Sequence, residues 1–326
     1  MAQNTTNSQA FIEAEQYSSF ILRNLHDGLL PSTMYRNVTD FPSGSTLNIK
    51  TIGSVTIQDG AEDQALVSTP IDSNTITFKI NRYKGDSWHI TDELREEGSQ
   101  VEALMAARAS ESTRAIQEVF ESDFLQTCWD SMDAKDTSGK FAVNGFQHLY
   151  AAGGGNDTLS LEDISYMKLA FDKANVPMAG RILIVDPIAA TVLQNQITLT
   201  GSDISPISKS MIETGFARDH NFLFNIFGFD IITSNRLPTV SSYATYKSDG
   251  STAKTASGIV NIAMCIADDN TRPMMGAWRR MPKVETERIP SLRRDVFYTT
   301  CRYGFGCQRL DTMGCIISSA TATKAN

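Results

Sequence analysis

The chain has 326 residues, of which 41% are hydrophobic and 20% charged, and this composition is typical of a globular protein of about two domains. Its net charge of −8 argues against a sequence-specific DNA reader, which needs a basic footprint. The start MAQNTTNSQA has neither the basic nor the apolar region of a signal peptide, and no run of about 18 apolar residues indicates a membrane span.

The charge is unevenly distributed. Residues 272–309 contain nine basic and three acidic residues, a local charge of +6, which leaves −14 for the rest of the chain. Such a division suits a protein whose surfaces meet surfaces of opposite sign, and it equally suits a solvated face paired with acids of the same chain.

The first elements alternate between helix and strand. Apolar residues at a spacing of three and four predict an amphipathic helix that starts near Phe11 and ends near Gly28. Residues 47–57 and 76–80 alternate apolar and polar side chains, as half-buried strands do. They enclose an acidic tip, so residues 53–78 are predicted to form a long two-stranded excursion. Such a ribbon is marginal alone and needs a partner surface.

A long helix is predicted next. Ser99 and Glu102 have the spacing of a capping box, and no proline or glycine follows until Gly139. About 30 helical residues form a rod on the order of 45 Å long. Its apolar stripe is narrow, which favours packing against a sheet on one side and against solvent or a neighbour on the other.

The second half of the chain reads as an α/β segment. Three glycines at 153–155 are interpreted as a flexible domain boundary, in preference to an anion-binding nest. Ser160 is expected to cap a helix over 161–174, residues 181–185 form a buried strand, and Asp186 and Pro187 start another helix. Strands are expected at 222–234 and 258–267, with a loop-rich stretch at 239–257 between them. Residues 281–318 are again strand-like.

The sequence contains no recognisable catalytic or cofactor-binding motif. It lacks a phosphate loop and a dinucleotide fingerprint, and its four histidines are scattered. The five cysteines are expected to be reduced, buried thiols. Acidic pairs such as Asp268 and Asp269 are interpreted as turn residues. We therefore predict no catalytic residue, cofactor or metal ligand.

Taken in order, these parts resemble the major capsid proteins of tailed bacteriophages (Caudoviricetes), which have the Hong Kong 97 fold. The stretches that carry the resemblance are LNIKTIGS, KINRYKGDSWHITDELREEGSQ with the helix after it, LSLEDISYMKLAFDKANVPMAGRILIVDP, and IFGFDIITSNRLP. The resemblance implies an α+β fold. Its expected parts are an N-terminal arm (1–40), a peripheral domain (41–52 and 79–155) with a spine helix at about 100–130, an extended β-loop (53–78), an α/β axial domain (156–270), and a return to the peripheral domain (271–326).

The resemblance also implies a function. The chain would be a structural late protein, not an enzyme, that self-assembles as hexamers and pentamers into an icosahedral shell enclosing double-stranded DNA. The resemblance further implies assembly in the host cytoplasm, a portal protein and a decoration protein as partners, and no contact with a membrane. Residues before the arm are too few for a built-in scaffold, so a separate scaffolding protein is expected. Residues 51–78 contain no lysine, so covalent cross-linking of subunits through the loop is not expected.

Charge suggests where subunits meet. An acidic loop tip is expected to contact basic residues of a neighbour, and the candidate contacts are Asp59, Glu62, Asp63, Arg279, Arg280, Arg293 and Arg294. Two alternatives remain. One is an encapsulin-like nanocompartment shell with the same fold, and the other is an unrelated α/β enzyme that uses Asp186 or Asp268 in a cleft.

Overall fold

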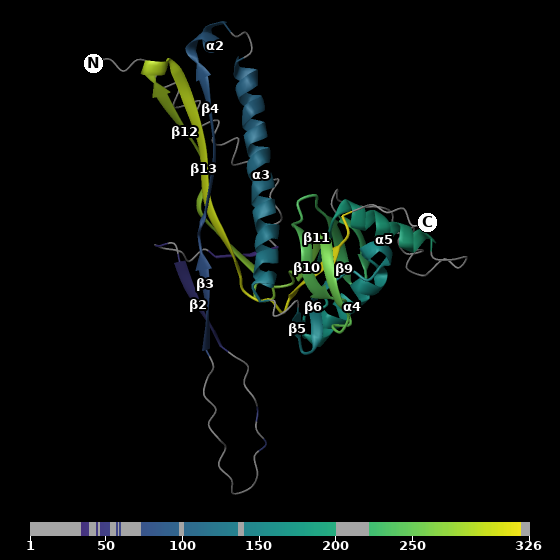
Figure 1. Cartoon of the computed structure of the whole chain (residues 1–326). Helices are drawn as coiled ribbons and strands as arrows, with labels where there is room; N and C mark the ends of the chain where they lie inside the picture. The colour runs from purple at the N-terminus through teal and green to yellow at the C-terminus, as the bar shows by residue number, and fades with distance from the viewer. Residues whose placement is uncertain are drawn as a thin grey trace.

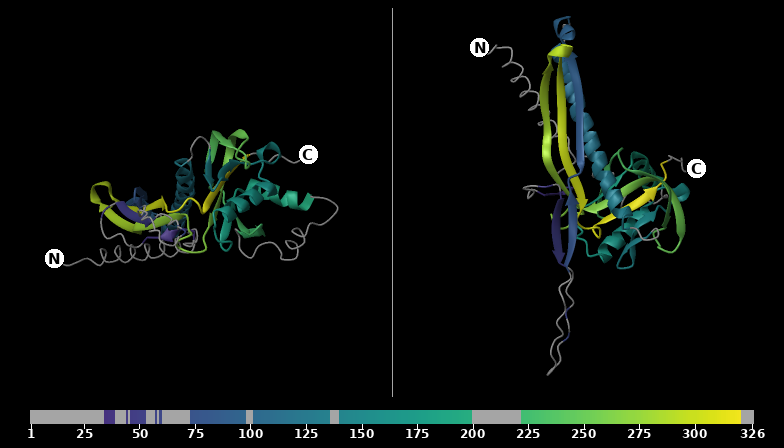
Figure 2. Two further views of the ribbon diagram at one scale, coloured as in Figure 1. Left: turned by 90° about the horizontal axis from the view of Figure 1, so that it is seen from below. Right: turned by 60° about the vertical axis from the view of Figure 1, so that its left-hand side comes forward.

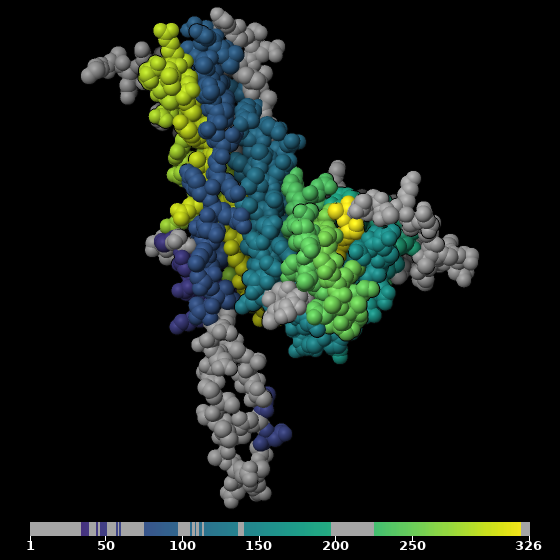
Figure 3. Space-filling model, in the orientation of Figure 1, coloured from purple at the N-terminus to yellow at the C-terminus, as the bar shows by residue number. Residues whose placement is uncertain are grey.

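The computed structural model describes residues 34–38, 44, 46–52, 57, 59, 73–97, 101–135, 140–199 and 222–320. The helix predicted within residues 11–28 and the predicted cap Ser99 lie outside these residues. The described chain forms an elongated unit and a compact unit that meet along one long helix (Figures 1 and 3). None of the described helices is both long and apolar enough to span a membrane.

The elongated unit is a four-stranded sheet of order β1-β12-β13-β4. Its three long strands pair antiparallel and form one narrow blade (Figure 2). At the far end the chain turns through the short helix η2, and helix α2 lies beside this turn. The bounds are Arg36–Asn37 (β1), Arg82–Thr91 (β4), Asp92–Glu97 (α2), Met274–Ile289 (β12), Pro290–Leu292 (η2) and Arg294–Cys307 (β13). Strand structure predicted for 281–318 is confirmed.

A two-stranded ribbon leaves the near end of this sheet. Strands β2 (Thr46–Ile52) and β3 (Ser73–Lys79) pair antiparallel from Thr46↔Lys79 to Ile52↔Ser73, which confirms a ribbon at the base of the predicted excursion. The rest of the excursion, except for residues 57 and 59, lies outside the described residues. The buried side chain of Phe78 anchors the base against Met275 and Ala277 of β12. Gly304 allows the backbones to cross closely, because a Cβ atom there would lie 2.5 Å from the carbonyl oxygen of Lys79.

The predicted long helix is confirmed. Helix α3 spans Val101–Asp133, 33 residues or about 50 Å at 1.5 Å per residue. One core cluster joins it to both sheets: Phe120 and Phe124 meet Tyr303 and Phe305 of β13, and Leu125, Cys128 and Met132 belong to the same cluster as residues of the compact unit. The helix is therefore the shared wall between the two units.

The compact unit is an eight-stranded sheet with two helices. The main path is β5-β6-β14-β11-β7-β9-β8, and β10 pairs with β11. The strand bounds are Phe141–Val143 (β5), Phe146–Ala151 (β6), Arg181–Val185 (β7), Phe222–Ile226 (β8), Phe229–Thr233 (β9), Thr239–Tyr246 (β10), Ala253–Cys265 (β11) and Met313–Ser318 (β14). Helices α4 (Leu161–Lys173) and α5 (Pro187–Leu199) share a second core cluster with β7 and β9.

Both predicted helix starts in this unit are confirmed. The hydroxyl oxygen of Ser160 accepts a hydrogen bond from the amide of Asp163, whose carboxylate in turn accepts from the amide of Ser160, a complete capping box. The carboxylate of Asp186 accepts from the amide of Ile188, with Pro187 at the first helical position.

Three expectations need correction. Residues 239–257 are not loop-rich, because β10 and β11 form a hairpin there whose threonines and tyrosines favour strands and whose turn is built on Asp249 and Gly250. The glycines at 153–155 are not a boundary: the amide of Gly153 donates to the carboxylate of Asp163, so this turn is bound inside the compact unit.

The third correction concerns the expected domain limits, which grouped residues 141–151 with the elongated unit and residues 313–318 with the return segment. Strands β5, β6 and β14 instead pair within the compact sheet, where β14 lies between β6 and β11. The physical reason is long-range pairing: the short apolar run at residues 313–318 is compatible with a buried strand but does not specify its neighbours.

Candidate intersubunit surfaces

The far tip of the elongated sheet carries two of the candidate contacts. Arg293 follows η2 in a left-handed conformation with φ 47°, and its carbonyl oxygen accepts a hydrogen bond of 2.9 Å from the amide of Asp92. Its side chain is exposed, and Arg294 is half-buried on the first residue of β13. Neither guanidinium lies within ion-pair distance of an acid among the described residues.

Neighbouring charges at this tip are already paired within the chain. Arg288 reaches both carboxylate oxygens of Asp92 at 2.5 and 2.6 Å and Asp295 at 3.0 Å, and Arg95 pairs with Asp295 at 2.9 Å. Hydrogen bonding to Arg288 lowers the pKa of Asp92. The network ties α2 to the β12–β13 turn, and among the described residues it leaves Arg293 and Arg294 outside its ion pairs.

Arg279 and Arg280 lie elsewhere on β12. Both are exposed, and Arg280 donates to the hydroxyl of Thr300 at 3.2 Å and lies 3.9 Å from Glu285. Nine residues separate Arg280 from the end of β12 at Ile289, roughly 30 Å of strand at about 3.3 Å per residue. The structure therefore divides the four candidate arginines into a pair midway along the blade and a pair at its tip.

The one acidic candidate among the described residues lies towards the opposite end. Asp59 is exposed and follows β2, whereas Glu62 and Asp63 lie outside the described residues. The base of the β2–β3 ribbon meets β13 near Gly304, and the β12–β13 turn is at the other end of that strand (Figure 1). One chain does not bring Asp59 together with the arginines of the tip.

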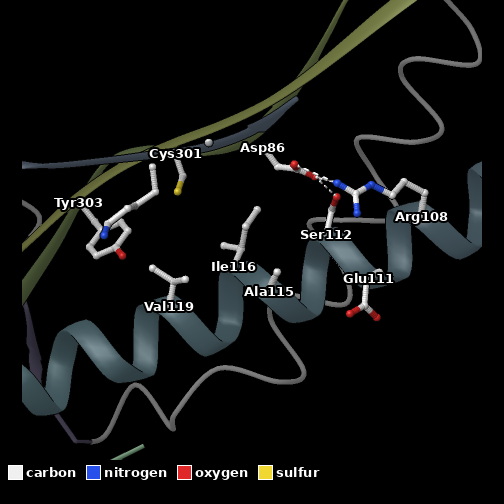
Figure 4. Close-up of a pocket in the computed structure, with 11 residues that line it drawn as sticks. Asp86, Arg108, Glu111, Ser112, Ala115, Ile116, Val119, Cys301 and Tyr303 are labelled. Carbon is white, nitrogen blue, oxygen red and sulfur yellow. Dashed lines mark hydrogen bonds and ion pairs between the residues drawn. The ribbon is translucent and has the colours of Figure 1, made fainter. Parts of the chain in front are cut away.

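A cavity of about 360 Å³ lies between α3 and the strands β4 and β13. One end is polar: Asp86 accepts hydrogen bonds of 3.0 Å from Arg108 and 2.5 Å from the hydroxyl of Ser112 (Figure 4). The other end is apolar, with Ile116 and Val119 on α3 opposite Cys301 and Tyr303 on β13 (Figure 4).

A second charged cluster fastens the helix beside this cavity. The carboxylate of Asp123 pairs with Arg82 at 2.8 Å and Lys84 at 3.3 Å and accepts the hydroxyl of Tyr303 at 2.8 Å. Burial and the hydrogen bond to Asp123 both raise the pKa of Tyr303. Sequence reasoning missed this region, although the charged residues Arg82, Lys84 and Asp86 at alternate positions in the first half of β4 were a visible signal that one face of the strand meets polar partners.

The residues proposed for an enzyme have structural roles. Asp186 caps α5, and Asp268 sits in a turn closed by Thr271. Burial raises the pKa of Cys301 and Cys307 to about 11, so neither is an activated thiol. Among the described residues no group of histidine, cysteine, aspartate or glutamate side chains is arranged to hold a metal ion.

A projecting ribbon, a narrow blade, a long helix and a compact α/β unit define the Hong Kong 97 capsid fold, and solved structures share it. The cyanophage Pam1 capsid matches with a TM-score of 0.62 and 14% identity, covering 91% of this chain and 93% of that chain. The capsid of Ralstonia phage GP4 matches with 0.61 and 12%, covering 90% and 89%. An encapsulin from Synechococcus elongatus matches with 0.55 and 9%, covering 91% and 90%.

The family model for phage capsid protein matches residues 73–318, and the chain belongs to this family. A search of curated proteins finds no match. The chain is thus a structural shell protein of a phage virion and not an enzyme, and it associates with copies of itself.

Proposed function

We propose that this chain assembles as hexamers and pentamers into an icosahedral shell that encloses double-stranded DNA. The observation that carries the proposal is the β2–β3 ribbon, which packs on its own chain at its base and leaves Ile57, beyond its paired part, 92% exposed. Surface that one chain leaves uncovered is buried when copies overlap, and closed symmetry repeats each contact many times. The arm (1–40) and the loop (53–78) are the overlapping segments.

The two units take the two domain roles of the fold. The blade with α3 is the peripheral domain, and the compact unit, including β5, β6 and β14, is the axial domain. The core cluster shared through α3 supports this assignment, because it lets the units hold a defined relative orientation.

Electron microscopy of the purified protein tests assembly. Closed shells of uniform size are expected. A stable small oligomer under all solution conditions would contradict the proposal.

The second part of the proposal is that charged side chains pair between copies. Asp59, Glu62 and Asp63 of one copy would meet arginines of a neighbour, with Arg293 and Arg294 supported by their lack of an acidic partner among the described residues and Arg279 and Arg280 by their exposure. Reversing the three acids together should lower shell yield, and reversing the tip arginines in the same chain should restore it. Glu162→Lys, at an exposed position of α4, is the control for charge change alone. Unchanged yield in the triple variant rules out the pairing.

The remaining partners follow from the enclosed genome. A net charge of −8 limits adhesion of the shell to DNA, since each phosphate contact adds salt-dependent affinity. A portal protein, a separate scaffolding protein and a decoration protein complete the particle, which assembles in the host cytoplasm. Nuclease-protected DNA in isolated particles is the expected result. Particles that hold a protein cargo and no such DNA would favour the encapsulin alternative, which the structural likeness to an encapsulin keeps in view.

A further inference from the structure

His148 on β6 is a buried histidine that uses one of its two ring nitrogens. The residue is 0% exposed, and Nδ1 lies 3.0 Å from the carbonyl oxygen of Met313, the first residue of β14. A carbonyl oxygen can only accept a hydrogen bond, so Nδ1 carries the proton of the neutral ring and Nε2 is bare. Nε2 is itself buried and has no hydrogen-bond partner among the described residues. The site therefore suits the uncharged ring.

Aromatic side chains surround the imidazole. It stacks on Phe171 of α4, with ring centroids 5.5 Å apart, and it meets Phe141 of β5 at 6.0 Å in a T-shaped contact. The carbonyl group of Ala170 also faces the ring, but it already accepts the amide of Ala174 at 3.0 Å within helix α4. Protonation would place a second N–H and a positive charge in this apolar site, and burying an unpaired charge costs free energy.

Charged groups near the ring act in opposite directions. Asp311, on the connection between β13 and β14, favours protonation. Arg181 of β7 opposes it, because its guanidinium lies 5.7 Å from the centre of the Phe171 ring on which the imidazole stacks. Lys173 of α4 lies over a different aromatic ring. Burial lowers the pKa of His148, although the hydrogen bond of Nδ1 and the charge of Asp311 raise it.

The hydrogen bond of His148 fastens the start of β14. The register pairs of β6 and β14 begin at Leu149↔Cys315, whereas the imidazole reaches Met313, two residues earlier on β14. Asn261 of β11 holds the other end of the strand, since its amide donates to the hydroxyl of Ser318 at 2.8 Å. Of these two fastenings, only the histidine can change its charge near neutral pH.

We infer that His148 is an acid-sensitive latch for β14: the uncharged ring keeps the strand paired with β6, and protonation of the ring releases it. A histidine in the unfolded chain takes up a proton near pH 6.5, and the folded site resists this until the pH is lower. The stability of the β6–β14 pairing is therefore complete above the unfolded pKa and falls as pH decreases towards the folded pKa. The equilibrium constant for opening rises by up to about tenfold per pH unit over this interval.

Hydrogen exchange of the purified full-length chain tests the latch. With rates corrected for the intrinsic effect of pH, protection of residues 146–151 and 313–318 should fall by up to about tenfold per pH unit below about pH 6.5, while β4 keeps its protection. His148→Asn retains a donor for Met313 and cannot become charged, so its protection should not follow this course. His89→Asn, at an exposed position of β4, is the matched control and should behave as the wild type does.

Two results would overturn the inference. One is protection of β14 in the wild type that does not change with pH, and the other is an equal fall in His148→Asn. If the asparagine variant does not fold, nuclear magnetic resonance of the wild-type imidazole decides. His148 should show the chemical shifts of a neutral ring at about pH 6.5, where a histidine in water is about half charged, and a half-charged His148 would overturn the inference. None of these measurements requires shells, so their failure leaves the proposed function intact.

Discussion

Replacing Phe120 by alanine should separate the blade from the long helix. Phe120 is 1% exposed and stacks on Trp278 with ring centroids 4.8 Å apart, and Phe305 and Tyr303 lie at 4.9 and 5.0 Å. Truncating a buried phenylalanine costs about 3–5 kcal/mol through lost transfer free energy and the cavity left behind. Alanine returns up to roughly 0.5 kcal/mol as the better helix former. We expect the free energy of unfolding to fall by about 3–4 kcal/mol.

Urea unfolding of unassembled subunits measures this change. Tryptophan fluorescence reports on the affected contact, because Trp278 loses the ring that stacks on it. The matched control is Tyr166→Ala, which removes an aromatic ring from an α4 position that is 39% exposed and should cost less than about 1 kcal/mol. Equal losses for the two variants would refute the assignment of Phe120 as the link between helix and sheet.

Three further changes probe other parts of the fold. Gly304→Ala should cost about 1–3 kcal/mol, because its Cβ would meet the Lys79 carbonyl, and limited proteolysis should cut the β2–β3 ribbon faster than in the wild type. Burial raises the pKa of Asp163 above 3.8, so the stability of the wild type should fall relative to that of Asp163→Asn as pH rises through the folded pKa. Urea midpoints of both proteins at several pH values measure this, and midpoints that change in parallel with pH would contradict it. A double-mutant cycle of Glu121→Gln and Arg236→Met, whose side chains pair at 2.6 Å, should give a coupling of about 1 kcal/mol that declines with salt; a coupling indifferent to salt would count against an ionic link.

Sequence patterns predicted those elements whose hydrogen-bond partners are close in the sequence. Ser160 and Asp186 indicate helix starts because their hydrogen-bond partners are two or three residues away. Helix α3 was recognisable from an uninterrupted run without proline or glycine. The 153–155 glycines were misread because the carboxylate that accepts from the amide of Gly153, that of Asp163, lies on helix α4. Strand pairing of β14 with β6 joins residues that are 166 positions apart, as Cys315 and Leu149 are, which no local pattern specifies.

The candidate contacts were predictable only as charges. The basic segment is visible in the sequence, but the sequence does not indicate that Arg288 pairs with Asp92 and Asp295 while Arg293 forms no ion pair among the described residues. The contacts themselves stay predictions. Ile57 was visible only as one apolar position of a strand pattern. Its significance depends on its exposure, which neither composition nor spacing contains.

The position of β14 has a consequence for the synthesis of the protein. Residues 313–318 fill the place between β6 and β11, and they are synthesised more than 160 residues after β6. Until then the compact sheet has a gap with unpaired edges on both sides, and the nascent chain does not hold its final shape. We therefore expect a subunit to become competent to polymerise only after these residues have been synthesised, so that this topology would disfavour the entry of incomplete chains into a shell.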